Sequence, residues 1–218
     1  MNPVNDPVEL ATAITDAILG LLALLCALGL LAAAKRDPWK ARMWAVVFGL
    51  LAVASALGVA QHGLQTSLNT HNLVIHARDL ALAFTIALFV DGAWLDRWGA
   101  RGARRILPFL AVVALIFFGI TFAFPTTFLP FILYEAVAML FALGLYISLA
   151  VARQPGAGLI TAGIVVTILA AVAQVSSLAI DVIWRFDHNS IFHFIQMAGA
   201  LLLYSGLRVS LRAEPAQR

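Results

Sequence analysis

The sequence predicts an all-α membrane protein, a polytopic bundle of seven transmembrane helices that forms one domain over residues 1–218. The first observation is composition: 62% of the residues are hydrophobic and 11% are charged, whereas soluble domains carry about 25% charged residues. The second is pattern, because the apolar runs are each about 18–27 residues long, the length that crosses a bilayer. These observations exclude a soluble globular protein and a disordered chain. The basic residues lie in short loops between apolar runs, which excludes nucleic acid as a partner.

Each expected helix is an apolar run flanked by turn or charge signals. The helices are expected at residues 8–34, 43–63, 73–95, 106–124, 128–152, 157–183 and 189–210. The breaks between them fall at residues 35–38, 69–72, 96–105, 153–156 and 185–187 and at Pro125. Seven such helices use most of the chain and leave no separate soluble domain.

The basic residues predict the orientation of these helices, because cytoplasmic loops of membrane proteins are enriched in Lys and Arg. Twelve of the 14 basic residues fall on one side of the arrangement, and Arg78 and Arg185 fall on the other. The twelve are Lys35, Arg36, Lys40, Arg42, Arg97, Arg101, Arg104, Arg105, Arg153, Arg208, Arg212 and Arg218. We therefore expect an integral protein of the bacterial inner (plasma) membrane, with its N-terminus outside and its C-terminus in the cytoplasm.

The scarce polar residues of the helices gather in the outer half of this arrangement. All five histidines lie there, together with Glu9, Asp16 and Asp79. An ionisable residue in the hydrocarbon costs about 2.5–3.5 kcal/mol, so such residues usually face the bundle interior and pair with one another or with a ligand. We therefore expect a functional site that faces the outer side of the membrane. The alternative is a set of solvated helix ends, which fits His71 better than the residues farther inside.

Histidine and carboxylate together indicate a metal site, since catalytic zinc is typically held by three protein ligands and a water. His62, His188 and His193 would supply three nitrogens, and Asp79 would act as the general base on the zinc-bound water. His188 and His193 are five residues apart, about 140° around a regular helix, whereas Asn189 and His193 share a face. His188 still converges on the site if it precedes the first turn of its helix. Haem ligation by paired histidines is an equally compatible use of these residues.

At these positions the sequence resembles the seven-helix transmembrane hydrolase superfamily (CREST) of alkaline ceramidases and progestin/adiponectin receptors. The first helix carries Glu9, Thr12, Thr15 and Asp16, similar to the E-x-x-N-x-x-T-H or E-x-x-N-x-x-S-N of that superfamily. The second helix ends with Gly58 and His62, similar to S-x-x-x-H. Asp79 follows His62 by 17 residues, and the last helix opens with His188 and His193, close to H-x-x-x-H.

The resemblance implies a zinc ion held by three histidines, with the aspartate near a zinc-bound water that hydrolyses a lipid amide in the ceramidase branch. Gly58 replaces the serine whose hydroxyl lies beside the zinc, and Ser55 is about 10 Å from His62 along the helix. Glu9, Thr12 and Asp16 are expected to join the first helix to the second and seventh by buried hydrogen bonds. The residues expected to support the site are Glu9, Thr12, Thr15, Asp16, Ser55 and Asn189.

The sequence therefore predicts a zinc-dependent intramembrane hydrolase that acts on a lipid amide or a related acyl bond. Two alternatives remain open. Gly58 favours a non-catalytic zinc-containing membrane receptor or sensor, and the paired histidines allow a bis-histidine haem protein. For the hydrolase the expected partner is a membrane lipid as substrate, and for the receptor or sensor it is a membrane lipid as ligand.

Overall fold

Long helices make up most of the described chain. The structure is a computed structural model that describes residues 2–34, 37–124, 127–182 and 184–213. Its helices are α1 (Pro7–Ala32), α2 (Pro38–Gly63), α3 (Leu68–Ala123), α4 (Leu129–Val151), α5 (Ala157–Gln174) and α6 (His188–Arg212). Each of these six helices is long and apolar enough to cross a membrane. The fold is therefore all-α, as predicted, and it is that of a membrane protein.

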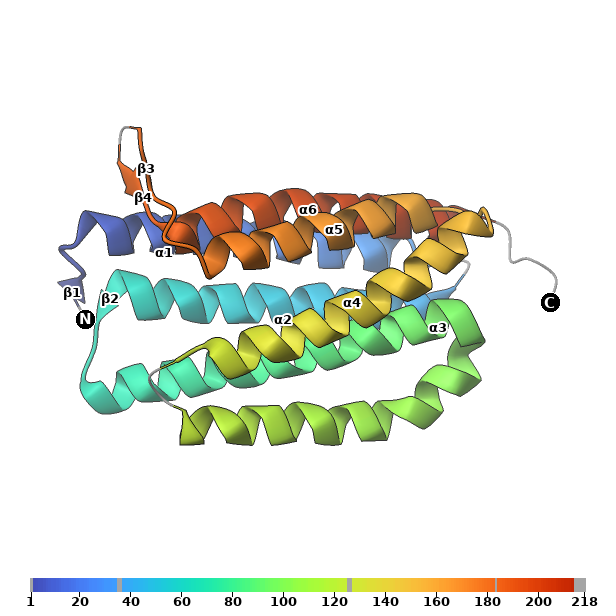
Figure 1. Cartoon of the computed structure of the whole chain (residues 1–218), viewed down its shortest axis with the longest axis horizontal. Helices are drawn as coiled ribbons and strands as arrows, with labels where there is room; N and C mark the ends of the chain where they lie inside the picture. Colours follow the sequence, from blue (N-terminus) through green and yellow to red (C-terminus); the bar gives the residue numbers. More distant parts are fainter. Residues whose placement is uncertain (1, 35–36, 125–126, 183, 214–218) are drawn as a thin grey trace.

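Two short antiparallel strand pairs lie at one end of the bundle, which we call the strand end (Figure 1). β1 (Asn2–Pro3) pairs with β2 (Leu64–Gln65), and β3 (Ile180–Asp181) pairs with β4 (Arg185–Phe186). β1 precedes α1 and β2 follows α2, so this pairing brings the start of α1 beside the end of α2.

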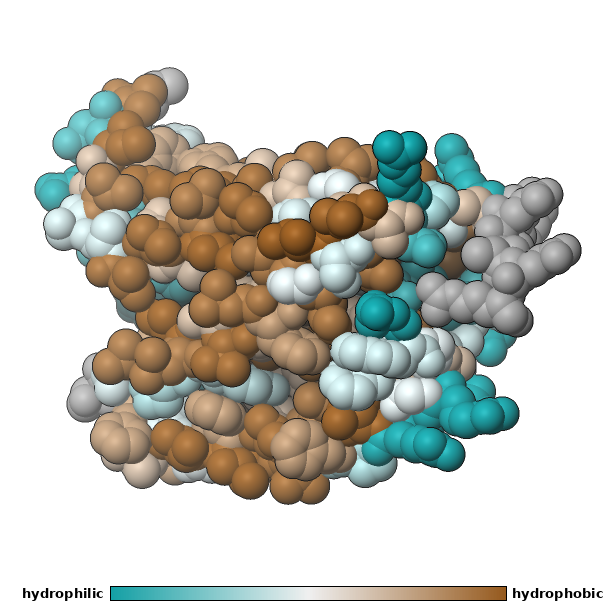
Figure 2. Space-filling view, turned by 45° about the vertical axis from the view of Figure 1, so that its right-hand side comes forward, coloured by the Kyte–Doolittle hydropathy of each residue, from teal (hydrophilic) through white to brown (hydrophobic). Residues whose placement is uncertain are grey.

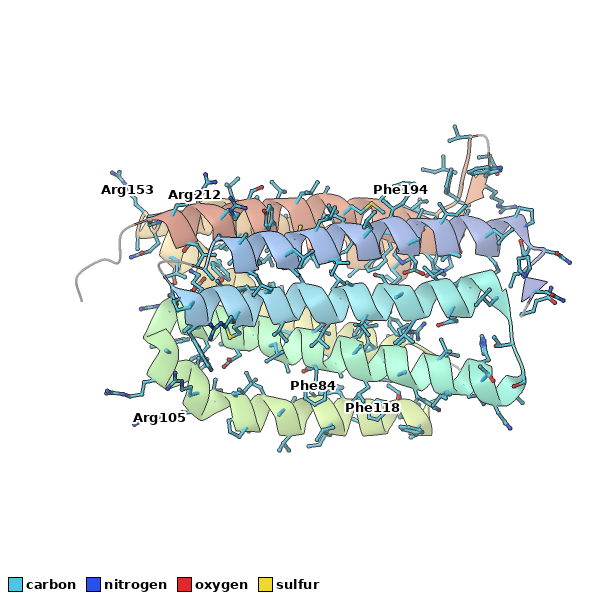
Figure 3. The ribbon with its side chains drawn as sticks, turned by 180° about the vertical axis from the view of Figure 1, so that it is seen from behind. Phe84, Arg105, Phe118, Arg153, Phe194 and Arg212 are labelled. Carbon is cyan, nitrogen blue, oxygen red and sulfur yellow. The ribbon has the colours of Figure 1, made fainter. Side chains whose placement is uncertain are left out.

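Helix α3 is divided into two antiparallel legs at Gly99, at the end of the bundle opposite the strands (Figure 1). We call this the Gly99 end. Gly99 has φ 78° and ψ 174°, a backbone conformation that residues with a side chain rarely adopt. Ile86 of the first leg and Ala114 of the second belong to one buried cluster. Phe84 and Phe118, labelled in Figure 3, pack against that cluster from the two legs.

The helices contact one another around a closed ring. α1 packs on α2, α2 on α3, α3 on α4, α4 on α5, α5 on α6, and α6 returns to α1. A buried cluster that includes Leu30, Trp44, Tyr146 and Leu207 fills the half of the ring toward the Gly99 end. Figure 2 shows a broad apolar outer surface, with hydrophilic side chains gathered mainly at the Gly99 end. This distribution suits a bundle whose sides face lipid.

A polar cluster ties four helices together at the Gly99 end. Lys40 Nζ on α2 lies 2.6 Å from Asp96 Oδ1 on α3 and donates to Ser210 Oγ on α6 at 2.6 Å. Tyr146 on α4 donates its hydroxyl to Asp96 Oδ2 at 2.7 Å. Lys40 and Asp96 are largely buried, and their pairing offsets the cost of burying each charge.

Several helix boundaries differ from the prediction because caps and turn residues act locally. α3 begins at Leu68, so the predicted break at residues 69–72 is wrong. Ser67 caps this helix by accepting from the Thr70 amide at 3.3 Å. The break predicted at 96–105 is present at Gly99, where α3 divides, but it is shorter than expected, because the rest of this segment is helical. Arg and Ala, which dominate this segment, are good helix formers.

Two further helix boundaries differ from the predicted ones. α2 begins at Pro38 rather than residue 43, with the Asp37 carboxylate accepting from the Lys40 amide at 3.0 Å. α5 ends at Gln174 rather than residue 183. The Ser176 hydroxyl donates to the Ala173 carbonyl and accepts from the Leu178 amide, which turns the chain toward β3. The predicted break at Pro125 and the basic residues Lys35, Arg36 and Arg218 lie outside the described residues.

Candidate ligand-binding site

A cavity of about 850 Å³ lies inside the ring of helices, and all six helices contribute to its wall. Along α2 the lining runs from Trp44 to His62, 18 residues apart, which corresponds to about 27 Å of helix. Toward the strand end the wall carries polar side chains. Toward the Gly99 end it is lined by large apolar side chains such as Phe48, Phe89 and Leu203. The cavity is therefore long, with more polar side chains at the strand end, which we call its mouth, and an apolar interior toward the Gly99 end.

Helix α1 is joined to the start of α6 by hydrogen bonds beside this mouth. Thr12 Oγ1 donates to Asp187 Oδ1 at 3.1 Å and lies 3.0 Å from Ser190 Oγ. Asp187 also accepts from the Ser190 amide at 2.9 Å, so the same carboxylate caps α6. Burial alone would raise the pKa of Asp187. The hydrogen bonds from Ser190 and Thr12 and the nearby His188 outweigh burial, so the pKa lies below its ordinary value.

His193 is held between two side chains of α1, one turn farther into the bundle. Its Nδ1 lies 2.8 Å from Thr15 Oγ1, and its Nε2 lies 3.3 Å from Asp16 Oδ1. Thr15 donates its own proton to the Thr12 carbonyl at 2.8 Å, so it accepts from Nδ1–H. A hydrogen bond between Nε2 and Asp16 then needs one proton, carried by either the imidazole or the carboxyl group. Both imidazole nitrogens are therefore engaged within the protein.

Gly58 on α2 makes room for the Asp16 carboxyl group. A Cβ at position 58 would lie 2.6 Å from Asp16 Cγ and 2.7 Å from Oδ1, far inside van der Waals contact. The carboxyl group thus occupies the space that a serine side chain would need. Ser55, the other hydroxyl considered for this role, is buried on the same helix and lines the cavity.

The remaining predicted residues lie around the same mouth. His62 Nδ1 is 2.7 Å from Glu9 Oε2, which joins α2 to α1. Asp79 is buried and lines the cavity, but its Oδ1 accepts from Arg78 Nη2 at 2.7 Å. Asn189 also lines the cavity. Hydrogen bonds thus join the first helix to the second and to the last, as expected, but the bond from Glu9 to His62 is exposed rather than buried.

These residues do not fit a metal ion in the arrangement observed. His62, His188, His193 and Asp79 all line one cavity. Across the described residues, however, no group of three or more His, Cys, Asp or Glu side chains is placed to hold a metal. The two nitrogens of His193 bind Thr15 and Asp16, and Asp79 is paired with Arg78. α6 already begins at His188, so His188 does not precede the first turn and points about 140° away from His193 around the helix.

Sequence reasoning missed the residue that neutralises Asp79 and several polar residues deeper in the wall. Arg78 also donates to Gln61 Oε1 at 2.5 Å, and its guanidinium lies over the Phe128 ring at 5.2 Å. Five buried polar atoms of cavity-lining residues have no partner in the part of the chain that the structure describes. They are Trp44 Nε1, His76 Nδ1, Thr167 Oγ1, Gln174 Oε1 and Gln196 Oε1. In the sequence, the signal that could have indicated these residues is a polar side chain inside an apolar run.

A family model described as "Family of unknown function (DUF6962)" matches residues 11–212, which is most of the chain. The chain belongs to this family. No curated protein and no solved structure matches it. In this DUF6962 protein the matched region contains every residue that lines the cavity, from Asp16 to Leu203. Within the same region lie the bonds that attach α1 to α6, whereas Glu9 precedes it.

Proposed function

We propose that this DUF6962 membrane protein binds a lipid or another single-chain amphiphile in its central cavity. The observation that carries the proposal is the change in polarity along the cavity. Its mouth is lined by His62, Asp79 and His188, and its interior by side chains such as Phe48 and Leu203. A ligand with a polar headgroup and a long apolar chain matches this change.

We further propose that the two legs of α3 cross the membrane separately, which gives seven spans. Residues 68–98 and 100–123 form the legs, and each is longer than the roughly 20 residues that a bilayer requires. Arg105, Arg153 and Arg212 lie together at the Gly99 end in Figure 3. An excess of Arg and Lys favours a cytoplasmic position for that end. The cavity mouth would then face the outer side of the membrane.

The charges at the mouth favour a neutral or cationic headgroup. Besides four histidines, the ionisable side chains that line the cavity are Asp16, Arg78, Asp79 and Glu135. Arg78 is paired with Asp79 and Asp16 contacts His193, which leaves the carboxyl group of Glu135 to receive hydrogen bonds. An anionic headgroup would face carboxyl groups without a free guanidinium to bind it. We therefore expect a headgroup that carries hydroxyl or amine groups.

The test is binding of radiolabelled monoolein, whose headgroup is neutral and rich in hydroxyls, to the purified full chain in a scintillation proximity assay. Leu51 lines the cavity and Val53 is half-exposed on the outside of the same helix. Leu51→Trp should fill the cavity and weaken binding at least tenfold, whereas Val53→Trp should bind like the wild type. Wild-type protein that fails to bind monoolein, or equal binding by both variants, would overturn the proposal.

A second proposal is hydrolysis of a lipid amide or a related acyl bond, with zinc supplied as the resemblance implies. The observation that favours it is that His62, His188, His193 and Asp79 all line one cavity, although the observed arrangement does not bring them together as metal ligands. A headgroup bound at the mouth would place its amide or ester bond among these side chains. Binding without turnover would instead fit the receptor or sensor alternative.

Metal analysis and turnover of a fluorescent ceramide by the purified protein separate these functions. A hydrolase should contain stoichiometric zinc that the His62→Ala/His193→Ala variant loses. Asp79→Asn should keep the zinc and lose turnover. A fully zinc-loaded double variant would remove the two histidines as ligands. Wild-type protein that binds monoolein but holds no zinc and releases no fatty acid would leave amphiphile binding as the function.

A further inference from the structure

Two buried polar side chains on neighbouring helices lie deep in the cavity wall. Thr167 on α5 and Gln196 on α6 are 2% and 8% exposed, and both line the cavity. Thr167 Oγ1 and Gln196 Oε1 are buried atoms without a hydrogen-bond partner among the described residues. Buried polar atoms are seldom left unpaired, because an unpaired one loses its bonds to water without replacement. The two atoms therefore indicate a polar group that enters the cavity.

Thr167 differs from other threonines within the helices of this chain. Thr85, Thr121 and Thr161 each donate their hydroxyl to a backbone carbonyl three or four residues earlier, which satisfies the group locally. The Thr167 hydroxyl instead lies against α6, where a Cβ at Gly199 would be 2.8 Å from Oγ1. Gly199 is three residues beyond Gln196, so the Thr167 hydroxyl faces α6 within about one helical turn of the Gln196 position.

Their depth places them below the polar mouth. Thr167 is seven residues before the end of α5, and Gln196 is eight residues after the start of α6. Both positions correspond to about 11–12 Å from the strand end of their helices. Beyond them the lining continues with Ala200 and Leu203. A ligand chain that enters from the mouth would pass this polar pair before it reaches the apolar interior.

We propose that the ligand carries a hydroxyl group on its chain, about 12 Å from the headgroup, and that Thr167 and Gln196 bind it. This inference rests on the proposed amphiphile binding. Gln196 Oε1 is an acceptor and needs a donor, and the Thr167 hydroxyl donates as well as accepts. A ligand hydroxyl satisfies both, because it donates to Oε1 and accepts from Oγ1. A carbonyl on the chain would leave Oε1 unpaired.

The test compares two monoacylglycerols that differ in one group. Monoricinolein carries a hydroxyl in the middle of the chain of monoolein and has the same headgroup. Wild-type protein should bind monoricinolein about three- to tenfold more tightly in the scintillation proximity assay, which is the gain expected from a net hydrogen bond. The Thr167→Val/Gln196→Leu variant should bind the two lipids equally or prefer monoolein. Thr161→Val, whose hydroxyl is already paired within α5, should keep the wild-type preference.

Each result distinguishes this inference from the function on which it rests. Equal affinity of the wild type for both lipids would overturn the chain-hydroxyl site and leave amphiphile binding intact, with water as the partner of the two atoms. The same preference in Thr167→Val/Gln196→Leu as in the wild type would also overturn it. No binding of either lipid by the wild type would overturn the proposed function itself.

Discussion

Asp16 and Gly58 depart from the pattern that the sequence otherwise resembles, and the structure connects the two departures. Asp16 stands where that pattern has histidine or asparagine, and Gly58 stands where it has serine. The Asp16 carboxyl group occupies the space beside Gly58 Cα and faces His193. A serine side chain at position 58 would overlap this carboxyl group, since interiors are close-packed. The two residues therefore act as one unit that positions His193.

The first prediction follows from this contact. Gly58→Ser should lower the free energy of unfolding by about 1–3 kcal/mol, because the added side chain overlaps the Asp16 carboxyl group. Gly49→Ser, on the same helix with open space around it, should have little effect. Thermal unfolding of the purified variants in detergent measures both. Equal melting temperatures for the two variants would show that position 58 tolerates a side chain and that Asp16 does not fill its space.

The second prediction concerns Asp187. Its pKa is lower in the folded protein than in the unfolded chain, so its charged form stabilises the fold above the unfolded pKa of about 4. This stabilisation is lost as the pH falls through the folded pKa. Asp187→Asn keeps a capping residue but removes the titration. The difference in melting temperature between wild type and Asp187→Asn should therefore shrink as the pH falls from 6 to 3. A constant difference would contradict this role.

Much of the residue-scale arrangement could be predicted, because polar side chains in an apolar environment must find one another. Glu9 meets His62 and Thr12 meets the start of α6 as expected. The pairing of Arg78 with Asp79 could not be predicted. Consecutive residues of a helix point in different directions, and only the long side chain of arginine lets it turn back to its neighbour.

At the scale of elements, α5 and α6 approach closely because glycines face each other. A Cβ at Gly163 would lie 2.9 Å from the Leu203 amide nitrogen and 3.0 Å from the Gly199 carbonyl oxygen. A Cβ at Gly156 would meet the Gly206 backbone as closely. Small residues that let two backbones approach are typical of helix pairs in membranes. This pair also carries Thr167 and Gln196, so its spacing affects how these two side chains are placed.

The third prediction tests that spacing. Gly163→Val should separate α5 from α6 and lower the melting temperature, with a loss of at least about 2 kcal/mol, because backbone atoms cannot move aside as a flexible side chain can. Gly158→Val, on the same helix with nothing within 4 Å of its Cβ position, is the matched control. A melting temperature for Gly163→Val that equals that of Gly158→Val would show that the helices can separate without loss.

The positions of helix ends were harder to predict than the helices themselves. Apolar runs indicate which residues lie in the membrane, but the ends depend on single caps such as Ser67 and Asp37. The charged segment between residues 96 and 105 was expected to be a loop because of its polarity. It is helical except at Gly99, since a helix that continues beyond the membrane surface needs no apolar residues.

At the scale of the whole molecule, two polar clusters hold the ring at its two ends. Thr12, Thr15 and Asp16 join α1 to α6 at the strand end. Lys40 and Asp96 join α2 to α3 at the Gly99 end, where Tyr146 and Ser210 add α4 and α6. The cavity lies between the two clusters. The fold class followed from composition, whereas the cavity did not, because it depends on how six helices close into a ring.

The fourth prediction concerns the orientation of this ring. Asn69 and Arg101 are exposed residues at the start and the reversal of α3, and Thr127 is an exposed residue between α3 and α4. In a Cys26→Ala background, cysteine at 69 or 127 should react with a membrane-impermeant maleimide applied to intact cells. Cysteine at 101 should react only after the membrane is opened. Reaction of all three from the same side would contradict separate crossing by the two legs.

The closure of the ring through α1 and α6 also determines when the protein becomes complete during its synthesis. The ribosome makes α1 first and α6 last, so Thr12, Thr15 and Asp16 precede their partners Ser190 and His193 by nearly the whole chain. Until α6 enters the membrane, the inward face of α1 carries hydroxyl and carboxyl groups without those partners. A chain that stops before α6 therefore displays polar groups inside the bilayer, where each of them is costly without a partner.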